Sequence, residues 1–561
     1  MSRTSPAGTP LGDDFHLYDT TLRDGAQREG ISYSVADKLA VARQLDALGV
    51  GFIEGGWPGA LPKDTEFFAR AAAGELELAH AALVAFGSTR RSGLAAADDP
   101  QLRALLDSRA PVVTLVAKSD RRHVERALRV DVAEACAMVR DTVALLVAEG
   151  RRVFLDAEHF FDGYAHDADC ALRVLEAAMT AGADVAVLCD TNGGQLPLGL
   201  AETVAEVVAR TGFRVGIHCQ DDTACAVANS VAAVQAGATH VQCTANGYGE
   251  RTGNADLFAV TANLATKLGM PVLPQAGMAE LTRTAHTLAE IANLAPDTHQ
   301  AYVGTSAFAH KAGLHASAIK VDPELYNHLD PAVVGNSQRV LVTEMAGRAS
   351  VELKGTELGL DLAGRSAEVG VVTDRVKDLE SQGWSFEAAD ASFELLLRSE
   401  VDEVAPAPPF VLESYRVVVD HTADGRVVAE ATVKVHVAGA RVLATEEGNG
   451  PVNALDAALR QALASHVPWL DDVELADYKV RILPGAHGTD AVTRVLVQTT
   501  DGSGEWTTVG VHGNVVEASW LALVDAMTYA ALRHDAPSPA ECAMVVRGSV
   551  AAHAHREDRP S

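Results

Sequence analysis

Three features of the sequence predict an α/β protein whose first half is a closed (β/α)8 barrel, the TIM-barrel architecture. Eight short apolar, β-branched runs occur between residues 15 and 247, and each is followed by a longer segment with helical periodicity. The stretch has the length of one such barrel, about 250 residues. No GxGxxG motif follows the first run, which disfavours the alternative, a doubly wound open sheet.

The strands and helices of the barrel can be assigned in order from these runs. Helices are expected between the strands because segments such as 34–50 and 167–182 space their apolar residues helically and end near a glycine, which favours a helix C-cap. The eight predicted strands are residues 15–23, 51–57, 76–86, 111–118, 151–160, 183–191, 213–220 and 239–247.

Beyond the barrel the periodicity changes twice. After about residue 272 the strand pattern gives way to helices with short loops, and the proline-rich PAPP run marks a linker. Short strands joined by DG and AG turns, with two helices, then predict a small α+β domain. The expected organisation is a tail (1–14), the barrel (15–272), a helical connector (273–400), the linker (401–410), the α+β domain (411–534) and a flexible tail (535–561).

The composition excludes several classes of partner. Lys plus Arg number 46 and Asp plus Glu number 75, which gives a formal charge of −29, so nucleic acid and anionic membrane surfaces are not expected partners. No apolar run approaches the roughly 20 residues of a membrane span, and the N-terminus lacks the apolar stretch of a secretory signal. The seven cysteines form no CxxC pair, which disfavours disulfide scaffolds and zinc fingers. We expect a cytoplasmic protein.

Polar residues at the carboxyl ends of the predicted strands are candidates for a functional site, because barrel active sites lie there. Residues 218, 220 and 222 share one face of the seventh strand, so His218, Gln220 and Asp222 are expected to point together into the barrel mouth. With Asp24 and Asn254 from neighbouring strands, the set has the mixed nitrogen and oxygen ligands of a divalent cation site. Mg²⁺, Mn²⁺ and Zn²⁺ all fit this pattern.

Several long motifs resemble one enzyme family. YDTTLRDGAQ, DAEHFFDGY, LCDTNGG, ANGYGERTGNADL and AFAHKAGLHASAI occur in the order found in the acetyl-CoA-dependent α-keto acid condensing enzymes, the isopropylmalate and homocitrate synthase family with its aldolase-like barrel. EGGWPGALPKD, GNSQRVLVTEMAGR and EGNGPVNALDAALRQAL resemble the citramalate synthase branch of this family. The resemblance runs from about residue 15 to residue 533.

The resemblance implies roles for individual residues. Arg23 would polarise the keto oxygen, and Glu158, Thr191 and Gln27 would contact the keto acid. His315 would reach the partner subunit's active site, accompanied by Tyr326, and the methyl proton of acetyl-CoA would pass to Glu158, Glu250 or His315. The implied metal ligands are Asp24, His218, Gln220 and Asn254.

One position departs from the family pattern. The seventh strand of the family carries HxHxD, whereas this chain has His218, Cys219 and Gln220. A glutamine offers a carbonyl oxygen to a hard cation but is a weaker zinc ligand than imidazole, so Mg²⁺ or Mn²⁺ is favoured over Zn²⁺. Three alternatives stay open here: an oxygen-rich active site, an altered substrate, or a weakened site.

The implied activity is a Claisen-type condensation of acetyl-CoA with pyruvate, followed by hydrolysis to citramalate and CoA, as in isoleucine biosynthesis. The resemblance also implies a homodimer, and an amino-acid effector such as isoleucine at a regulatory C-terminal domain. One alternative is a synthase acting on another α-keto acid in a specialised pathway. The other is a catalytically weakened regulatory homologue, for which Gln220 is the main support.

Overall fold

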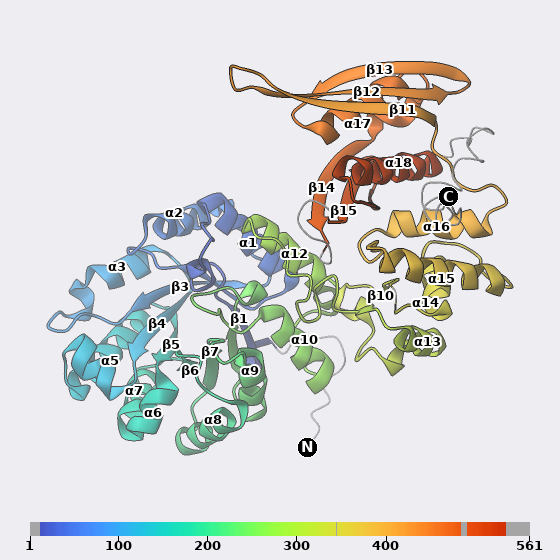
Figure 1. Ribbon diagram of the computed structural model, residues 1–561. Coiled ribbons are helices and arrows are strands. Elements are labelled where there is room, and N and C mark those ends of the chain that lie inside the picture. Colours follow the sequence, from blue (N-terminus) through green and yellow to red (C-terminus); the bar gives the residue numbers. More distant parts are fainter. Residues whose placement is uncertain (1–11, 344, 484–490, 535–561) are drawn as a thin grey trace. The chain divides into compact units, whose positions relative to one another are not determined.

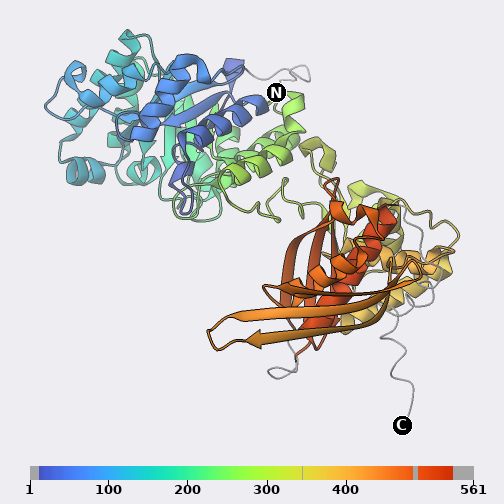
Figure 2. The ribbon, with the colours of Figure 1, turned by 90° about the horizontal axis from the view of Figure 1, so that it is seen from above.

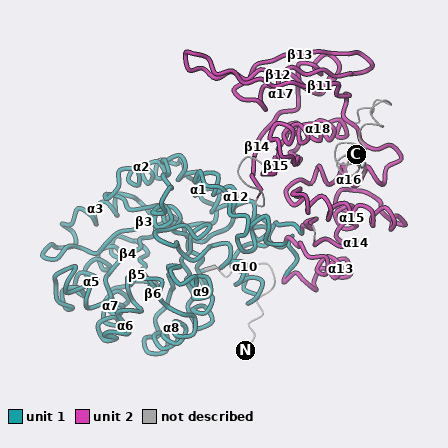
Figure 3. The backbone as a smooth tube through the Cα atoms, viewed as in Figure 1, with its two compact units in different colours: residues 1–308, 329–338 teal, residues 309–328, 339–561 magenta. Residues whose placement is uncertain are grey.

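The computed structural model describes residues 12–343, 345–483 and 491–534. The chain divides into two compact units, residues 1–308 with 329–338 and residues 309–328 with 339–561, which Figure 3 colours separately. The tails expected at 1–14 and 535–561 lie outside the described residues, apart from the short helix η1 (Gly12–Asp14).

The first unit contains a closed barrel of eight strands in sequence order, which confirms the predicted fold class (Figure 1). Every neighbouring pair is parallel, and β1 pairs with both β2 and β8, which closes the barrel. The strands are β1 (His16–Asp19), β2 (Phe52–Gly56), β3 (Ala82–Ser88), β4 (Val112–Lys118), β5 (Arg152–Glu158), β6 (Val185–Asp190), β7 (Val215–Cys219) and β8 (His240–Cys243).

The predicted third strand, 76–86, is wrong at its start. β3 begins at Ala82, and residues 71–75 form a π-helical turn. The carboxylate of Asp46, on helix α1 (Val35–Leu48), accepts hydrogen bonds from the backbone N–H groups of Ala79, His80 and Ala81 at 2.7–2.8 Å. These donors are therefore unavailable to a strand ladder, and the chain enters the barrel only after them.

Helices surround the barrel, and capping residues determine where helix α1 begins and ends. Ser34 and Asp37 form a capping box at the start of α1, and Gly49 ends it in a left-handed conformation (φ 97°). The other helices of at least seven residues are α2 (Pro62–Arg70), α3 (Pro100–Asp107), α5 (Val132–Ala148), α6 (Phe160–His166), α7 (Ala168–Thr180), α8 (Pro197–Thr211), α9 (Ala226–Gln235), α10 (Leu257–Leu268) and α12 (Leu281–Ile291).

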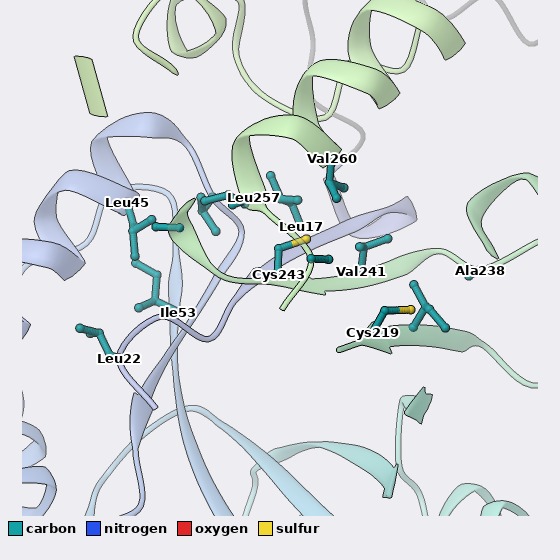
Figure 4. Packing of buried hydrophobic residues seen from close by; sticks show 14 of the residues in the cluster. Leu17, Leu22, Leu45, Ile53, Cys219, Ala238, Val241, Cys243, Leu257 and Val260 are labelled. Atoms are coloured by element: carbon teal, nitrogen blue, oxygen red, sulfur yellow. The ribbon is translucent and has the colours of Figure 1, made fainter. Parts of the chain in front are cut away.

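Two layers of side chains fill the first unit. Between strands and helices lies a large apolar cluster that includes Leu45, Ile53 and Cys219, shown with their neighbours in Figure 4. Inside the barrel a separate cluster contains Tyr18 and Phe154 with other apolar strand residues. Cys219 is only 1% exposed, so its thiol belongs to the packed core.

The second unit combines helices with two antiparallel sheets and a two-stranded parallel one, in agreement with the α+β domain expected after the barrel (Figure 2). The connector expected at 273–400 is divided between the units, because residues 273–308 and 329–338 belong to the first. The second unit repeats one motif, three antiparallel strands followed by a helix, which the sequence analysis did not identify. The helices of the connector are α13 (Gly313–Val321), α14 (Arg348–Glu357), α15 (Ser366–Ser381) and α16 (Asp390–Val401). The repeats are β11 (Val411–His421), β12 (Val427–Val437), β13 (Ala440–Gly448) and α17 (Pro451–Leu463), then β14 (Glu474–Ile482), β15 (Thr493–Thr500), β16 (Glu505–His512) and α18 (Val515–Arg533).

Helix α18 corrects the expectation that no apolar run approaches the length of a membrane span. Within the described part of the chain, this 19-residue helix is long and apolar enough to cross a bilayer, but 67% of its apolar window is buried in the protein. Its residues Ala518, Ala522 and Ala526 pack with Val495 and Val497 of β15. The helix is thus a core element of the second repeat.

Replacing a buried leucine of α1 tests the packing of the first unit. Leu45 is fully buried, so Leu45→Ala should lower the free energy of unfolding of the barrel by about 2–5 kcal/mol. Leu198→Ala is the control, because this leucine is 83% exposed and its loss should change the value by less than about 0.5 kcal/mol. Urea unfolding followed by circular dichroism would measure both, and equal effects would contradict the described core.

Candidate active site at the barrel mouth

The carboxyl ends of the strands surround a cavity of about 670 Å³ in the first unit. Charged and polar residues line it together with apolar ones such as Trp57, Phe86 and Met138. Eight of the residues predicted from the sequence line this cavity: Arg23, Asp24, Gln27, Glu158, Thr191, His218, Gln220 and Glu250.

The four predicted metal ligands lie together on one side of the cavity. Asp24 Oδ2 is 3.3 Å from His218 Nε2 and 3.4 Å from Gln220 Nε2. Asn254 is joined to Gln220 by an isolated antiparallel bridge, although it does not itself line the cavity. All four residues are buried, with exposures between 4% and 7%. Residues from the first, seventh and eighth strand ends therefore converge as the sequence predicts.

Two amide oxygens of this group have no donor. Gln220 Oε1 and Asn254 Oδ1 are buried without a hydrogen-bond partner among the described residues, whereas buried acceptors are almost always satisfied. Leaving such an oxygen unpaired costs about 1–3 kcal/mol. A cation bound beside Asp24 and His218 would supply the missing interaction once the Gln220 amide turns Oε1 instead of Nε2 towards it, so the residues present fit a divalent metal. In the described part of the chain, no group of three or more His, Cys, Asp or Glu side chains has metal-site geometry. The four predicted metal ligands include only two of these types, Asp24 and His218, because the other two are amides.

The imidazole of His218 is oriented by residues behind it. Its Nδ1 lies 2.9 Å from Gln242 Oε1, and Gln242 Nε2 donates to Asp156 Oδ1 at 2.8 Å. Because the amide N–H is committed to Asp156, the carbonyl faces His218 and Nδ1 must carry a proton. The other nitrogen, Nε2, faces Asp24, which is the orientation of a metal-binding histidine.

Opposite charges set the ionisation of this pair. Burial opposes ionisation of Asp24, but the neighbouring Arg23 and the hydrogen bond with His218 lower the pKa of the carboxyl group to about 2. Burial likewise opposes a charge on His218, but Asp24 raises the pKa of the imidazole. Asp24 is therefore an anion at neutral pH, as a carboxylate ligand has to be.

Arg23 is fixed by a buried carboxylate that the sequence analysis missed. Its Nε donates to Glu54 Oε2 at 2.6 Å, and the guanidinium carbon lies 3.9 Å from the centre of the Phe86 ring. Glu54 is fully buried and also accepts hydrogen bonds from Tyr18 Oη at 2.6 Å and Thr20 Oγ1 at 2.5 Å. The signal was available, because Glu54 is the single charged residue within the apolar run GFIEGGW.

The neighbouring strand ends contribute a second ion pair. Glu158, at the end of β5, is paired with Lys118, at the end of β4. Thr191 Oγ1 accepts the backbone N–H of His159 at 2.8 Å, so its own proton points elsewhere. Lys118 also lines the cavity and was not singled out, although a lysine closing the apolar strand PVVTLVAK is visible in the sequence.

One residue predicted to point into the mouth, Asp222, does not line the cavity. Asp222 was expected to share a face with His218 and Gln220, but β7 ends at Cys219 and the alternation of side chains ends with it. Asp222 is exposed and forms an ion pair with Arg251 at 2.8 Å instead. The prediction of three residues on one face is wrong for this position.

His315 and Tyr326 lie in the second unit. His315 is on α13, and its ring centre is 4.1 Å from that of Tyr326 and 6.1 Å from that of His310. The two predicted residues thus accompany each other. Their predicted role at the active site of the partner subunit stays a prediction.

Three family models match successive segments of the chain. The HMGL-like family matches residues 14–288, the homocitrate synthase post-HMGL domain-like family matches 302–383, and the LeuA allosteric (dimerisation) domain matches 387–531.

Full-length relatives carry one description. The chain is 63% identical to the (R)-citramalate synthase of Streptomyces coelicolor, an alignment that covers 94% of this chain and 98% of the relative. It is 48% identical to the Synechocystis (R)-citramalate synthase, over 91% and 95% of the two chains, and 45% identical to that of Aquifex aeolicus, over 94% and 99%. The chain therefore belongs to the (R)-citramalate synthase family of acyl-transferring condensing enzymes.

Proposed function

We propose that the protein condenses acetyl-CoA with pyruvate and hydrolyses the product to (R)-citramalate and CoA, in the cytoplasm, as a step of isoleucine biosynthesis. The observation that carries this proposal is the convergence of Asp24, His218, Gln220 and Asn254 beside Arg23 in one cavity. Similarity to (R)-citramalate synthases along nearly the whole chain supports the choice of substrates.

The proposed metal ligands are Asp24, His218, Gln220 and Asn254. One nitrogen and three oxygen donors favour Mg²⁺ or Mn²⁺, with Zn²⁺ as the alternative. The Gln220 amide now directs Nε2 towards Asp24, and half a turn about its terminal bond exchanges that nitrogen for the unpaired Oε1. A bound divalent cation would act as a Lewis acid on the keto acid.

Side chains of the protein stabilise the developing charge, orient the keto acid and remove the methyl proton. Arg23, held by Glu54, directs its remaining N–H groups into the cavity and stabilises charge that develops on the keto oxygen. Thr191 and Gln27 orient the keto acid. Glu158 is engaged by Lys118, whereas Glu250 lines the cavity and its carboxylate forms no hydrogen bond or ion pair within the described residues. We favour Glu250 over Glu158 and His315 as the base that takes the methyl proton.

A panel of keto acids tests the proposed activity. With acetyl-CoA and Mg²⁺, Mn²⁺ or Zn²⁺ in turn, we expect thiol release to be fastest with pyruvate, and mass spectrometry to identify citramalate. Faster release with a larger keto acid would favour the specialised-pathway alternative. No release with any pair would favour a catalytically weakened regulatory homologue.

Variants of Gln220 test its role as a ligand. Gln220→Ala should weaken Mn²⁺ binding, measured by titration calorimetry, by at least about tenfold, because an oxygen donor is removed. Gln220→His should shift the preference towards Zn²⁺, since imidazole is the better zinc ligand. Metal binding by Gln220→Ala equal to that of the unmodified protein would show that Gln220 is not a ligand.

We infer that the C-terminal domain joins two copies of the chain and binds isoleucine as an effector. The match of residues 387–531 to an allosteric dimerisation domain supports this inference. Isoleucine should then weaken acetyl-CoA binding by about 5- to 150-fold, the usual range of coupling between sites, and acetyl-CoA should weaken isoleucine binding equally. Calorimetry on the full-length protein, with leucine and valine as controls, would measure both. No coupling with any of the three would contradict the inference.

A further inference from the structure

A basic segment lies beside the cavity of this strongly acidic chain. The protein has a formal charge of −29, yet residues 118–130, which follow β4 at the barrel mouth, contain Lys118 and four arginines against two carboxylates. The proposed reaction consumes acetyl-CoA, whose nucleotide end carries a diphosphate and a 3′-phosphate. The overall field of the chain repels such an anion, so a local positive site is needed.

Most of these basic groups are already engaged. Lys118 is paired with Glu158, Arg121 with Asp167 and Glu125, and Arg122 with Asp120. Arg126 and Arg129 are different, because both are exposed and neither forms a hydrogen bond or ion pair through its side chain within the described residues. Their positive charges are therefore free for a ligand.

The backbone holds Arg129 at the edge of the cavity. The residues on either side of it, Leu128 and Val130, both line the cavity. Arg129 itself has a left-handed conformation (φ 59°), and its backbone N–H donates to Val124, whose side chain is fully buried. The hydrogen bond to buried Val124 therefore fixes the conformation of this turn, and the Arg129 side chain is exposed to solvent.

Two further observations concern the residues around this turn. The ring of His123 stacks on that of His159, which follows β5, with centres 4.0 Å apart. Following the neighbouring strand β3, Arg91 also lines the cavity, with 68% of its side chain exposed and the carboxylate of Asp99 3.9 Å away. A third weakly paired arginine therefore borders the same opening.

We propose that Arg91, Arg126 and Arg129 bind the phosphates of the coenzyme A substrate at the rim formed by the β3 and β4 loops. Guanidinium groups recognise phosphate with paired, charge-assisted hydrogen bonds. The apolar side chains Leu128 and Val130 lie beside the pantetheine arm as the thioester enters the cavity. This inference rests on the proposed function, since it assumes a CoA thioester as substrate.

Binding of CoA to the full-length protein tests the site without turnover. Arg126→Ala and Arg129→Ala should each raise the Kd for CoA about three- to fivefold, and the double variant about 10- to 25-fold, if the two contributions add. The KM for acetyl-CoA should rise with the Kd, whereas kcat and the KM for the keto acid should stay within about twofold. Higher salt should reduce the difference between variants.

Arg109→Ala is a matched control. Arg109 is also exposed, left-handed (φ 58°) and without a side-chain partner in the described chain, but it precedes β4 at the opposite end of the barrel. Its loss should leave CoA binding unchanged. Circular dichroism would verify that each variant is folded.

Two CoA fragments identify the group that is bound. Dephospho-CoA should bind the unmodified protein less tightly than CoA, and the double variant should discriminate less between them. Pantetheine, which lacks phosphates, should bind all variants equally.

The outcomes separate this inference from the proposed function. A double variant that binds CoA as tightly as the unmodified protein overturns the phosphate site, even if citramalate is formed. An unmodified protein that binds no CoA overturns both. Arginine-dependent CoA binding without thiol release from any keto acid refutes the proposed function and leaves the phosphate site standing.

Discussion

The architecture of the barrel mouth depends on one buried carboxylate. Glu54 is fully enclosed, and an uncompensated charge there would be prohibitively costly. Three donors, Tyr18, Thr20 and Arg23, all converge on its two oxygens. Because Arg23 is adjacent to Asp24 in the chain, the contact that neutralises Glu54 also determines where the neighbouring carboxylate can lie. The hydrogen bond from Arg23 that stabilises buried Glu54 therefore also determines the position of Asp24 in the site.

Negative charge accumulates around this point. Asp156 is buried, and burial together with Glu54 raises its pKa to about 7. Asp24 and Glu158 border the same cavity, where Arg23 pairs with Asp24 and Glu54, and Lys118 pairs with Glu158. Bringing further oxygen ligands and an anionic keto acid into this space requires additional positive charge. A divalent cation meets that requirement, which links the electrostatics of the barrel interior to the proposed chemistry.

The sequence predicts the barrel well because strands buried on both faces leave continuous apolar runs. It predicts the polar strand ends for a related reason, since charged residues directly after such runs have few structural roles. The predictions from sequence are wrong where contacts between residues far apart in the chain determine the local structure. The start of β3 depends on Asp46 from another element, and the direction of Asp222 depends on where β7 ends and on Arg251. Glu54 is visible in the sequence as a lone carboxylate within an apolar strand, but its role follows only from its three partners, Tyr18, Thr20 and Arg23.

The loops that carry Gln220 and Asn254 explain why the glutamine is a chemical change rather than a structural one. Asp221 donates its backbone N–H to Gly253 at 2.9 Å, and residues 220 and 254 form a bridge. Gly253 has a positive φ of 99°, and a Cβ there would meet the carbonyl of Gly247 at 2.0 Å, so only glycine allows this close approach. Backbone contacts of this kind do not depend on which side chain occupies position 220. The scaffold that brings the ligands together therefore persists with glutamine, and the substitution acts through the type of donor atom that the cation meets.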